Sequence, residues 1–193
     1  MKLKTSTIVL IVLAAVILLL AILSIGSYNG LVDRYEKVEK YKSEIDNQLQ
    51  RRSDLIPNLV STVKQYANHE SKVFTDIAEA RAKLAGANTV AESAEADAQL
   101  RTALTNLLAI AEAYPELKAN QNFINLQDEL AGTENRIANA RRDYNNAAKD
   151  YNTKVRKFPS NIFANMFGFD TVEYFQASEG SKDNPDVGDL FGD

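Results

Sequence analysis

The chain has 193 residues, a formal net charge of −4 at pH 7, no cysteine and a single histidine. The lack of cysteine excludes disulfides, thiolate zinc sites and cysteine nucleophiles. Five acidic residues against one lysine after residue 176 account for the whole net charge. The rest of the chain is therefore nearly neutral and lacks the basic stripe of a nucleic-acid-binding protein. Glycine and proline are scarce, with 8 and 4 residues, which is typical of a helical protein.

The first structural signal is the apolar run from Ile8 to Ile25, eighteen residues with one serine and no charge. As a helix it would be about 27 Å long, close to the thickness of the hydrocarbon core of a bilayer. A cleaved signal peptide has a shorter apolar core, and Ser24-Ile25-Gly26 matches its cleavage site only loosely. Residues 1–26 are therefore predicted to form a retained transmembrane anchor. Basic residues lie on both sides of the run, so the orientation in the membrane stays open.

Apolar residues then recur with a three-four spacing, which predicts amphipathic helices. The first stripe is in phase with the apolar run, so one helix is expected to continue from the membrane into the soluble part. A turn is predicted at Arg51-Arg52, and a second helix after Asp54, a typical N-cap residue, with Pro57 in its first turn and Gly86 at its end. The two stripes are Tyr28, Leu31, Tyr35, Val38, Lys42, Ile45 and Leu49, and Ile56, Leu59, Val63, Tyr66, Glu70, Val73, Ile77, Ala80 and Leu84.

Two further helices are predicted downstream. Residues 89–92, Thr-Val-Ala-Glu, form a capping-box pattern that opens the third helix, and Tyr114-Pro115 prevents it from continuing. The fourth helix has the longest stripe and runs to Phe158. Its members are Phe123, Leu126, Leu130, Thr133, Ile137, Ala140, Tyr144, Ala147, Tyr151, Val155 and Phe158.

No strand-like alternation occurs, so the soluble part is predicted to be all-α. Four amphipathic helices with short connections favour an antiparallel up-and-down four-helix bundle with coiled-coil-like packing over residues 27–158, following the N-terminal transmembrane helix. A short apolar helix or extension is expected over residues 159–176, ending its turns at Gly168. Residues 177–193 are acidic and rich in glycine and proline, which predicts a disordered tail.

Long strings of this sequence resemble the LemA family. They are YNGLV (28–32), IDNQLQRRSDLIPNLVSTVKQYANHE (45–70), IAEARAKL (77–84), AEAYPELKANQNFINLQDEL (111–130), TENRIANARRDYNNAAKDYNTKVRKFPSNIFA (133–164) and FGF (167–169). The resemblance implies a bacterial, single-pass membrane protein with a helical-bundle domain, related to a magnetosome-membrane protein of magnetotactic bacteria. It implies no particular activity and leaves the topology open.

A polar network is predicted in the bundle core. Glu70 falls on an inward stripe beside His69, and an ionised carboxylate there has to be paired or shift its pKa. The inward polar candidates on other helices are Arg101, Thr133 and Glu134. The functional alternative is a metal or proton site, but one histidine cannot supply the two Glu-x-x-His motifs of a di-iron bundle. An internal network of His69, Glu70, Arg101 and Glu134 that fixes the helix register is therefore favoured.

Other polar groups have simpler interpretations. The arginine pairs at 51–52 and 141–142 could bind an acidic partner or a lipid headgroup, but the adjacent Asp54 and Asp143 favour solvated or neutralised pairs. Tyr144 and Tyr151, seven residues apart, are interpreted as core tyrosines.

The apolar segment Phe158–Phe169 is the candidate membrane-surface site. An even number of helices after the anchor returns the chain to the membrane side, where an apolar segment preceded by basic residues could contact lipid. The predicted contacts are Arg156, Lys157, Phe163, Met166, Phe167 and Phe169. The alternative is that these side chains close the end of the bundle core.

These patterns predict a non-catalytic, membrane-anchored scaffold or adaptor that binds protein partners or organises the membrane, without a cofactor. One alternative is an oligomeric membrane-remodelling protein with lipid as its partner. The other is an enzyme or metal-binding bundle centred on His69 and Glu70, which the sequence disfavours because no nucleophile with a base, phosphate loop or metal-spaced cluster is evident. We expect a single-pass protein of the cell membrane with a protein partner or a homo-oligomeric state, and no nucleic acid or small-molecule substrate.

Overall fold

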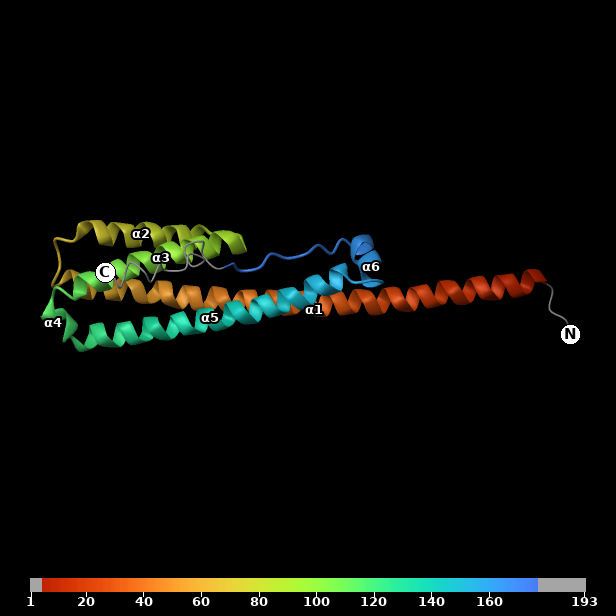
Figure 1. Cartoon of the computed structure of the whole chain (residues 1–193), viewed down its shortest axis with the longest axis horizontal. Helices are drawn as coiled ribbons and strands as arrows, with labels where there is room; N and C mark the ends of the chain where they lie inside the picture. The colour runs from red at the N-terminus through yellow and green to blue at the C-terminus, as the bar shows by residue number, and fades with distance from the viewer. Residues whose placement is uncertain (1–4, 177–193) are drawn as a thin grey trace, which may run out of the picture. The chain divides into compact units, whose positions relative to one another are not determined.

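The computed structural model describes residues 5–176, so the predicted acidic tail at 177–193 lies outside the described residues. The helices in chain order are α1 (Thr5–Lys64), α2 (Ser71–Gly86), α3 (Val90–Ala111), α4 (Pro115–Lys118), α5 (Gln121–Arg156) and α6 (Ser160–Phe167), as Figure 1 shows. No strand occurs between residues 5 and 176. The all-α fold class predicted from the sequence is confirmed.

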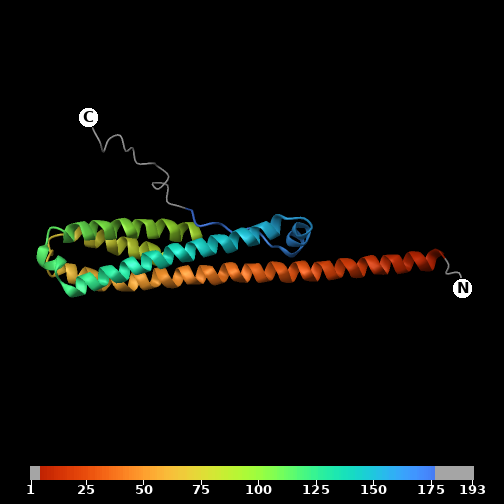
Figure 2. The same cartoon turned by 60° about the horizontal axis from the view of Figure 1, so that its bottom comes forward.

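The helices belong to two compact units. Unit 1 falls within Met1–Tyr41 and Asp143–Val172, and unit 2 within Lys42–Arg142 and Glu173–Asp193. The long helices α1 and α5 each contribute one part to both units, whereas α2, α3 and α4 belong to unit 2 and α6 to unit 1 (Figure 2).

Helix α1 is continuous over 60 residues, as the shared phase of the apolar run and the first stripe predicts. The predicted turn at residues 51–52 is wrong, because the helix passes through it and holds Pro57 in its interior. An interior proline costs about 3 kcal/mol. The buried stripe nevertheless continues without a phase change through Leu49, Arg52 and Ile56, all buried, and a break here would interrupt this packing.

The first break in the helical chain comes at residues 65–70, so the predicted second helix is divided between α1 and α2. The amides of Tyr66 and Ala67 both donate to the carbonyl of Val63, at 3.0 and 2.9 Å, which tightens the last turn of α1. Helix α2 ends at Gly86 as predicted. The capping box is confirmed: the Thr89 side chain accepts from the Glu92 amide while the Glu92 carboxylate accepts from the Thr89 amide.

Unit 2 has an apolar core to which four long helices contribute. Large side chains point inward from each of them, with Leu117 of α4 closing one end. The buried members are Ile56, Leu59 and Val63 of α1, Phe74, Ile77 and Ala80 of α2, Leu100, Ala103, Leu104, Leu107 and Ala111 of α3, and Phe123 of α5. Unit 2 is thus a helical bundle, with the C-terminal part of α1 in the place of the predicted second helix.

Unit 1 is built on the pairing of α1 with the C-terminal part of α5. The rings of Tyr35 and Tyr151 lie 5.6 Å apart, and Tyr151 is buried, as is Tyr144. The segment after α6 is held to α5 by Asn152: its side-chain amide donates to the Val172 carbonyl at 2.9 Å and accepts from the Val172 amide at 2.8 Å. One buried polar side chain therefore satisfies both backbone groups of Val172, which lies outside any helix.

Candidate functional site

Residues 158–169, here called the foot, have an unusual distribution of apolar side chains. The large side chains of Phe158, Ile162 and Met166 point outward, with 75%, 55% and 60% of their surface exposed. The buried positions of α6 are the small residues Ser160 and Ala164. This is the reverse of an ordinary amphipathic helix in water, which turns its large apolar residues inward.

Local hydrogen bonds fix the foot on the end of α5. The Ser160 hydroxyl donates to the carbonyl of Lys154 at 2.6 Å, so α6 starts directly against the last turn of α5. Gly168 ends α6 in the left-handed conformation, with φ at 74°, and the Phe169 amide donates to the Ala164 carbonyl at 2.9 Å. This is the usual role of glycine after a helix, because it has no Cβ to oppose a positive φ.

The foot lies against α1 where the apolar run ends. The ring of Tyr28 packs edge-on against those of Phe167 and Phe169, with centroids 5.1 and 5.6 Å apart. A pocket of about 260 Å³ lies between α1 and the start of α6. Its lining is Ile22, Leu23, Gly26, Ser27, Lys154, Pro159, Ser160 and Phe163.

The predicted membrane-surface residues divide into two groups. Arg156, Lys157, Met166 and Phe167 are exposed, whereas Phe163 and Phe169 are half-buried against the pocket and Tyr28 respectively. Both interpretations of this segment, contact with the membrane surface and closure of the end of the core, therefore apply, but to different side chains. Some pack inside unit 1 while others face outward.

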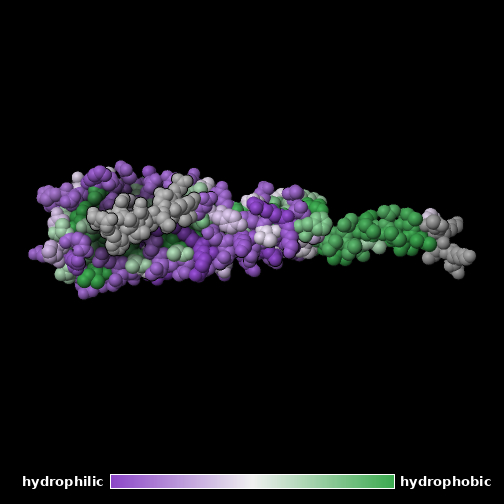
Figure 3. Space-filling model, in the orientation of Figure 1, coloured by the Kyte–Doolittle hydropathy of each residue, from purple (hydrophilic) through white to green (hydrophobic). Residues whose placement is uncertain are grey.

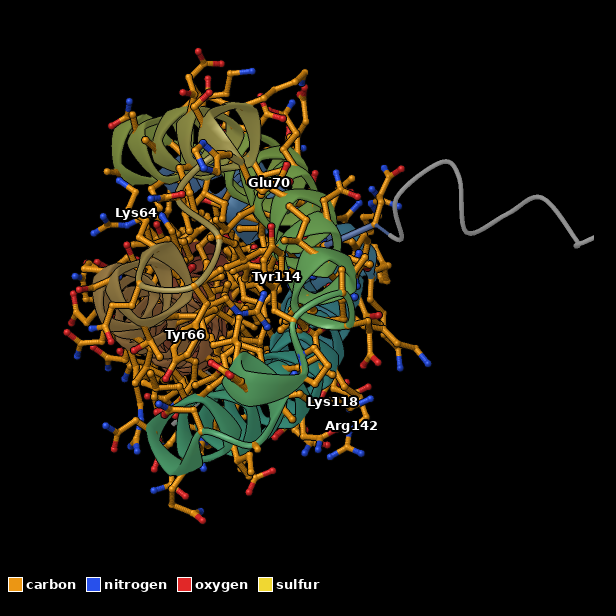
Figure 4. The ribbon with its side chains drawn as sticks, turned by 90° about the vertical axis from the view of Figure 1, so that its left-hand side faces the viewer. Lys64, Tyr66, Glu70, Tyr114, Lys118 and Arg142 are labelled. Carbon is orange, nitrogen blue, oxygen red and sulfur yellow. The ribbon has the colours of Figure 1, made fainter. Side chains whose placement is uncertain are left out.

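The predicted polar network has a different membership in the structure. His69 is exposed in the connection before α2, and Glu70 is half-buried at the N-terminal boundary of that helix without a side-chain cap hydrogen bond. Figure 4 looks at the end of unit 2 that carries Glu70 and, from the connection after α3, Tyr114. Placing these two residues in the core was wrong, because the chain leaves the helix at residue 65 and the stripe loses its phase.

An ionic cluster does form deeper in unit 2, and it contains the other two predicted residues, Arg101 and Glu134, joined at 3.4 Å. Its centre is Asp97, which is fully buried and accepts from Arg52 at 2.7 Å on one oxygen and from Arg141 at 2.9 Å on the other. Arg52, with 2% of its side chain exposed, also donates to Glu134.

The cluster ties α1, α3 and α5 together by charge. Both carboxylates are bridged by arginines, and the guanidinium of Arg141 also lies over the ring of Phe175, 5.2 Å from its centroid. Such an arrangement fixes the helices relative to one another inside unit 2. Of the two expected outcomes, solvated or neutralised, Arg52 and Arg141 show the second, with Asp97 as their shared partner, whereas Arg51, half-exposed, pairs with Glu129 at the surface.

Sequence spacing could have found the missing members. Arg52 lies three residues after Leu49 and four before Ile56, which places it on their helical stripe. Asp97 lies three residues before Leu100 and therefore shares a helix face with it. A charged residue in phase with an apolar stripe indicates a buried charge that needs a partner. The predicted turn at residues 51–52 removed Arg52 from its stripe.

Comparison with known proteins now decides the family. The LemA family model matches residues 41–188. The chain belongs to the LemA family. The match includes the part of α1 from residue 41 and α2 to α6 in full, and therefore the ionic cluster and the foot of this LemA-family chain.

Curated relatives have related names. The magnetosome protein MamQ of Magnetospirillum gryphiswaldense is 27% identical over 77% of this chain and 64% of its own length. Magnetosome protein MamQ 2 of Paramagnetospirillum magneticum is 28% identical with the same coverage. Protein LemA of Metamycoplasma hominis is 26% identical over 86% of this chain and 76% of its own. The LemA-family chain thus spans less than two thirds of the length of the magnetosome relatives.

Proposed function

We propose that this chain is a single-pass, membrane-anchored helical scaffold without catalytic activity, which binds protein partners or organises the membrane. The observation that carries the proposal is helix α1. It is the one helix in the described part of the chain that is long and apolar enough to cross a membrane, and none of its apolar window is buried. The same helix continues into the cores of both units, where Leu31 and Leu59 are fully buried.

The physical argument for the anchor is the cost of leaving this surface in water. Large apolar side chains from Ile8 to Ile25 are about half exposed or more. Leaving apolar surface in water costs about 25 cal/mol of free energy per Å². A helix in a bilayer satisfies its own backbone groups and places these side chains among acyl chains. The membrane is therefore the environment that suits this part of α1.

Two further observations support a scaffold. The charged groups of the ionic cluster are engaged with one another across three helices, which is an arrangement for holding helices in place. The relatives are named for the magnetosome or for LemA, and none of these names describes an enzyme. An organising role for this chain agrees with both.

The test is to crosslink the full chain in its native membranes, extract it with detergent and size the particle. A discrete second protein supports an adaptor, and a large homo-oligomer supports a membrane organiser. Leu18→Arg is the control, because a charge at the centre of the run costs about 3 kcal/mol or more and should weaken membrane retention. Recovery of the wild-type chain in the soluble fraction without detergent would contradict the anchor, and an uncrosslinked monomer would contradict the scaffold.

A further inference from the structure

The foot presents an apolar surface that unit 1 does not cover. Ile162 and Met166 are four residues apart, hence on one face of α6, and the opposite face carries Ser160 and Ala164, which are buried. Phe158 adds exposed aromatic surface, whereas Phe167 is 43% exposed and also packs against Tyr28. Closing the end of a core would require the large side chains to point inward, so Phe158, Ile162 and Met166 do not serve that purpose.

The position of this surface relates it to the membrane. The pocket lining joins the foot to Ile22 and Leu23, within the last turn of the apolar run, and to Gly26 and Ser27, just beyond it. The foot therefore lies at the level where α1 changes from apolar to polar. Figure 3 shows the apolar surface of α1 beginning beside α6, so the two apolar surfaces of unit 1 adjoin.

Polar groups on the same side suit lipid headgroups. Lys154, Arg156 and Lys157 precede the foot, and none of the three forms an ion pair with another described residue. Cations beside an apolar surface match phosphate groups above acyl chains.

We propose that the foot is a second membrane contact: α6 lies in the interfacial layer of the bilayer beside α1, with Ile162 and Met166 among acyl chains and Lys154 toward the headgroups. The occupant of this surface is lipid, because the surface continues the one that α1 buries in the membrane. The proposal rests on the membrane anchoring of α1 proposed above.

The absence of tryptophan from the natural chain makes a direct test possible. Full-length single-tryptophan variants are reconstituted in vesicles of phosphatidylcholine and phosphatidylglycerol whose acyl chains carry bromine, a contact quencher of indole fluorescence. Met166→Trp and Ile162→Trp report the foot, and far-UV circular dichroism checks that each variant folds. Leu18→Trp reports the anchor. Lys37→Trp is the matched negative control, exposed on α1 about 18 Å beyond Ile25 along the helix.

We expect strong quenching at Leu18→Trp, clear quenching at Met166→Trp and Ile162→Trp by bromines near the headgroups, and none at Lys37→Trp. Quenching at Leu18→Trp with none at either foot position overturns the inference and leaves the anchor standing. Unquenched but blue-shifted emission at the foot also overturns it, because protein and not lipid then covers the surface. Loss of quenching at Leu18→Trp overturns the anchor and this inference together.

Discussion

Two helices of this chain, α2 in unit 2 and α6 in unit 1, solve opposite packing problems. Helix α2 buries Phe74 and Ile77 and leaves its polar residues in solvent, as a helix on a water-soluble bundle must. Helix α6 buries Ser160 and Ala164 and exposes Met166. The comparison teaches that unit 2 turns its large apolar side chains inward, whereas unit 1 leaves several of them outward, as the proposed membrane contact requires. The predictions below are ways to break or sharpen this contrast.

The largest effect is expected in the ionic core of unit 2. Asp97→Ala removes the carboxylate between two arginines and leaves Arg52 with a single partner in the interior. Removing one partner from a buried ion pair costs about 3 to 5 kcal/mol. The measurement is the free energy of unfolding in urea, followed by circular dichroism in detergent.

The control for that substitution is Glu95→Ala on the same helix, where the carboxylate is exposed and bonds only to Gln99. We expect a change within about 0.5 kcal/mol. Equal losses in the two variants would show that the cluster contributes no more than a surface pair and that unit 2 is held by its apolar core alone.

The next effect contrasts the two units directly. Leu107→Ala opens a cavity at a fully buried position of α3 and should cost about 2 to 5 kcal/mol of unfolding free energy. Met166→Ala, at a 60% exposed position, should change it by less than about 0.5 kcal/mol. A loss at Met166 comparable to that at Leu107 would mean that the foot is core, and the contrast between the two units would fail.

A smaller effect is expected where unit 1 holds the segment after α6. Asn152→Ala leaves both backbone groups of Val172 without their partner, at a cost of about 1 to 3 kcal/mol. Hydrogen exchange at the Val172 amide should accelerate, whereas Asn146→Ala, at an exposed position of the same helix, should leave it unchanged. Unaltered exchange in Asn152→Ala would show that other contacts hold this segment.

Much of the fold follows from local spacing, and the rest depends on contacts that spacing does not contain. The stripes of α1 and α5 and the cap at Thr89 could be predicted because each depends on neighbours within a few residues. The break at residues 65–70 could not, since no glycine or proline marks it. The pairing of Arg52 with Asp97, 45 residues apart, depends on how three helices are rotated against one another. The half-burial of Phe163 and Phe169, predicted as surface contacts, likewise depends on which face of this segment meets α1.

The smallest effect is a pH dependence at the start of α3. Hydrogen bonds from the backbone amides of Asn88 and Thr89, at 2.8 and 3.1 Å, hold the pKa of the Glu92 carboxyl below its ordinary value of 4.5. The ionised form is favoured by folding, so its contribution is present above pH 4.5 and is lost as the pH falls through the lowered pKa.

The variant Glu92→Gln keeps a capping-box residue but cannot titrate. Its stability relative to the wild type should therefore rise as the pH is lowered past 4.5, when thermal melts are recorded over an acid series. The variant Glu95→Gln, whose side chain bonds to Gln99 in the wild type and not to a helix cap, should not reproduce this trend. A constant difference between Glu92→Gln and the wild type at every pH would show that the cap does not depend on charge.

Because α1 is continuous, an insertion changes two properties of the anchor: its rotation about the helix axis and its position along that axis. A single residue inserted between Ile25 and Tyr28 would turn the apolar run by about 100° about the helix axis, away from the foot. Seven inserted residues would bring the same face back to within about 20° while moving the run about 10 Å along the axis. The buried positions Leu31, Val38, Ile45 and Arg52 already recur at intervals of seven. Insertions of whole heptads would therefore move the apolar run along the helix axis while the same face of the run stays turned toward the foot.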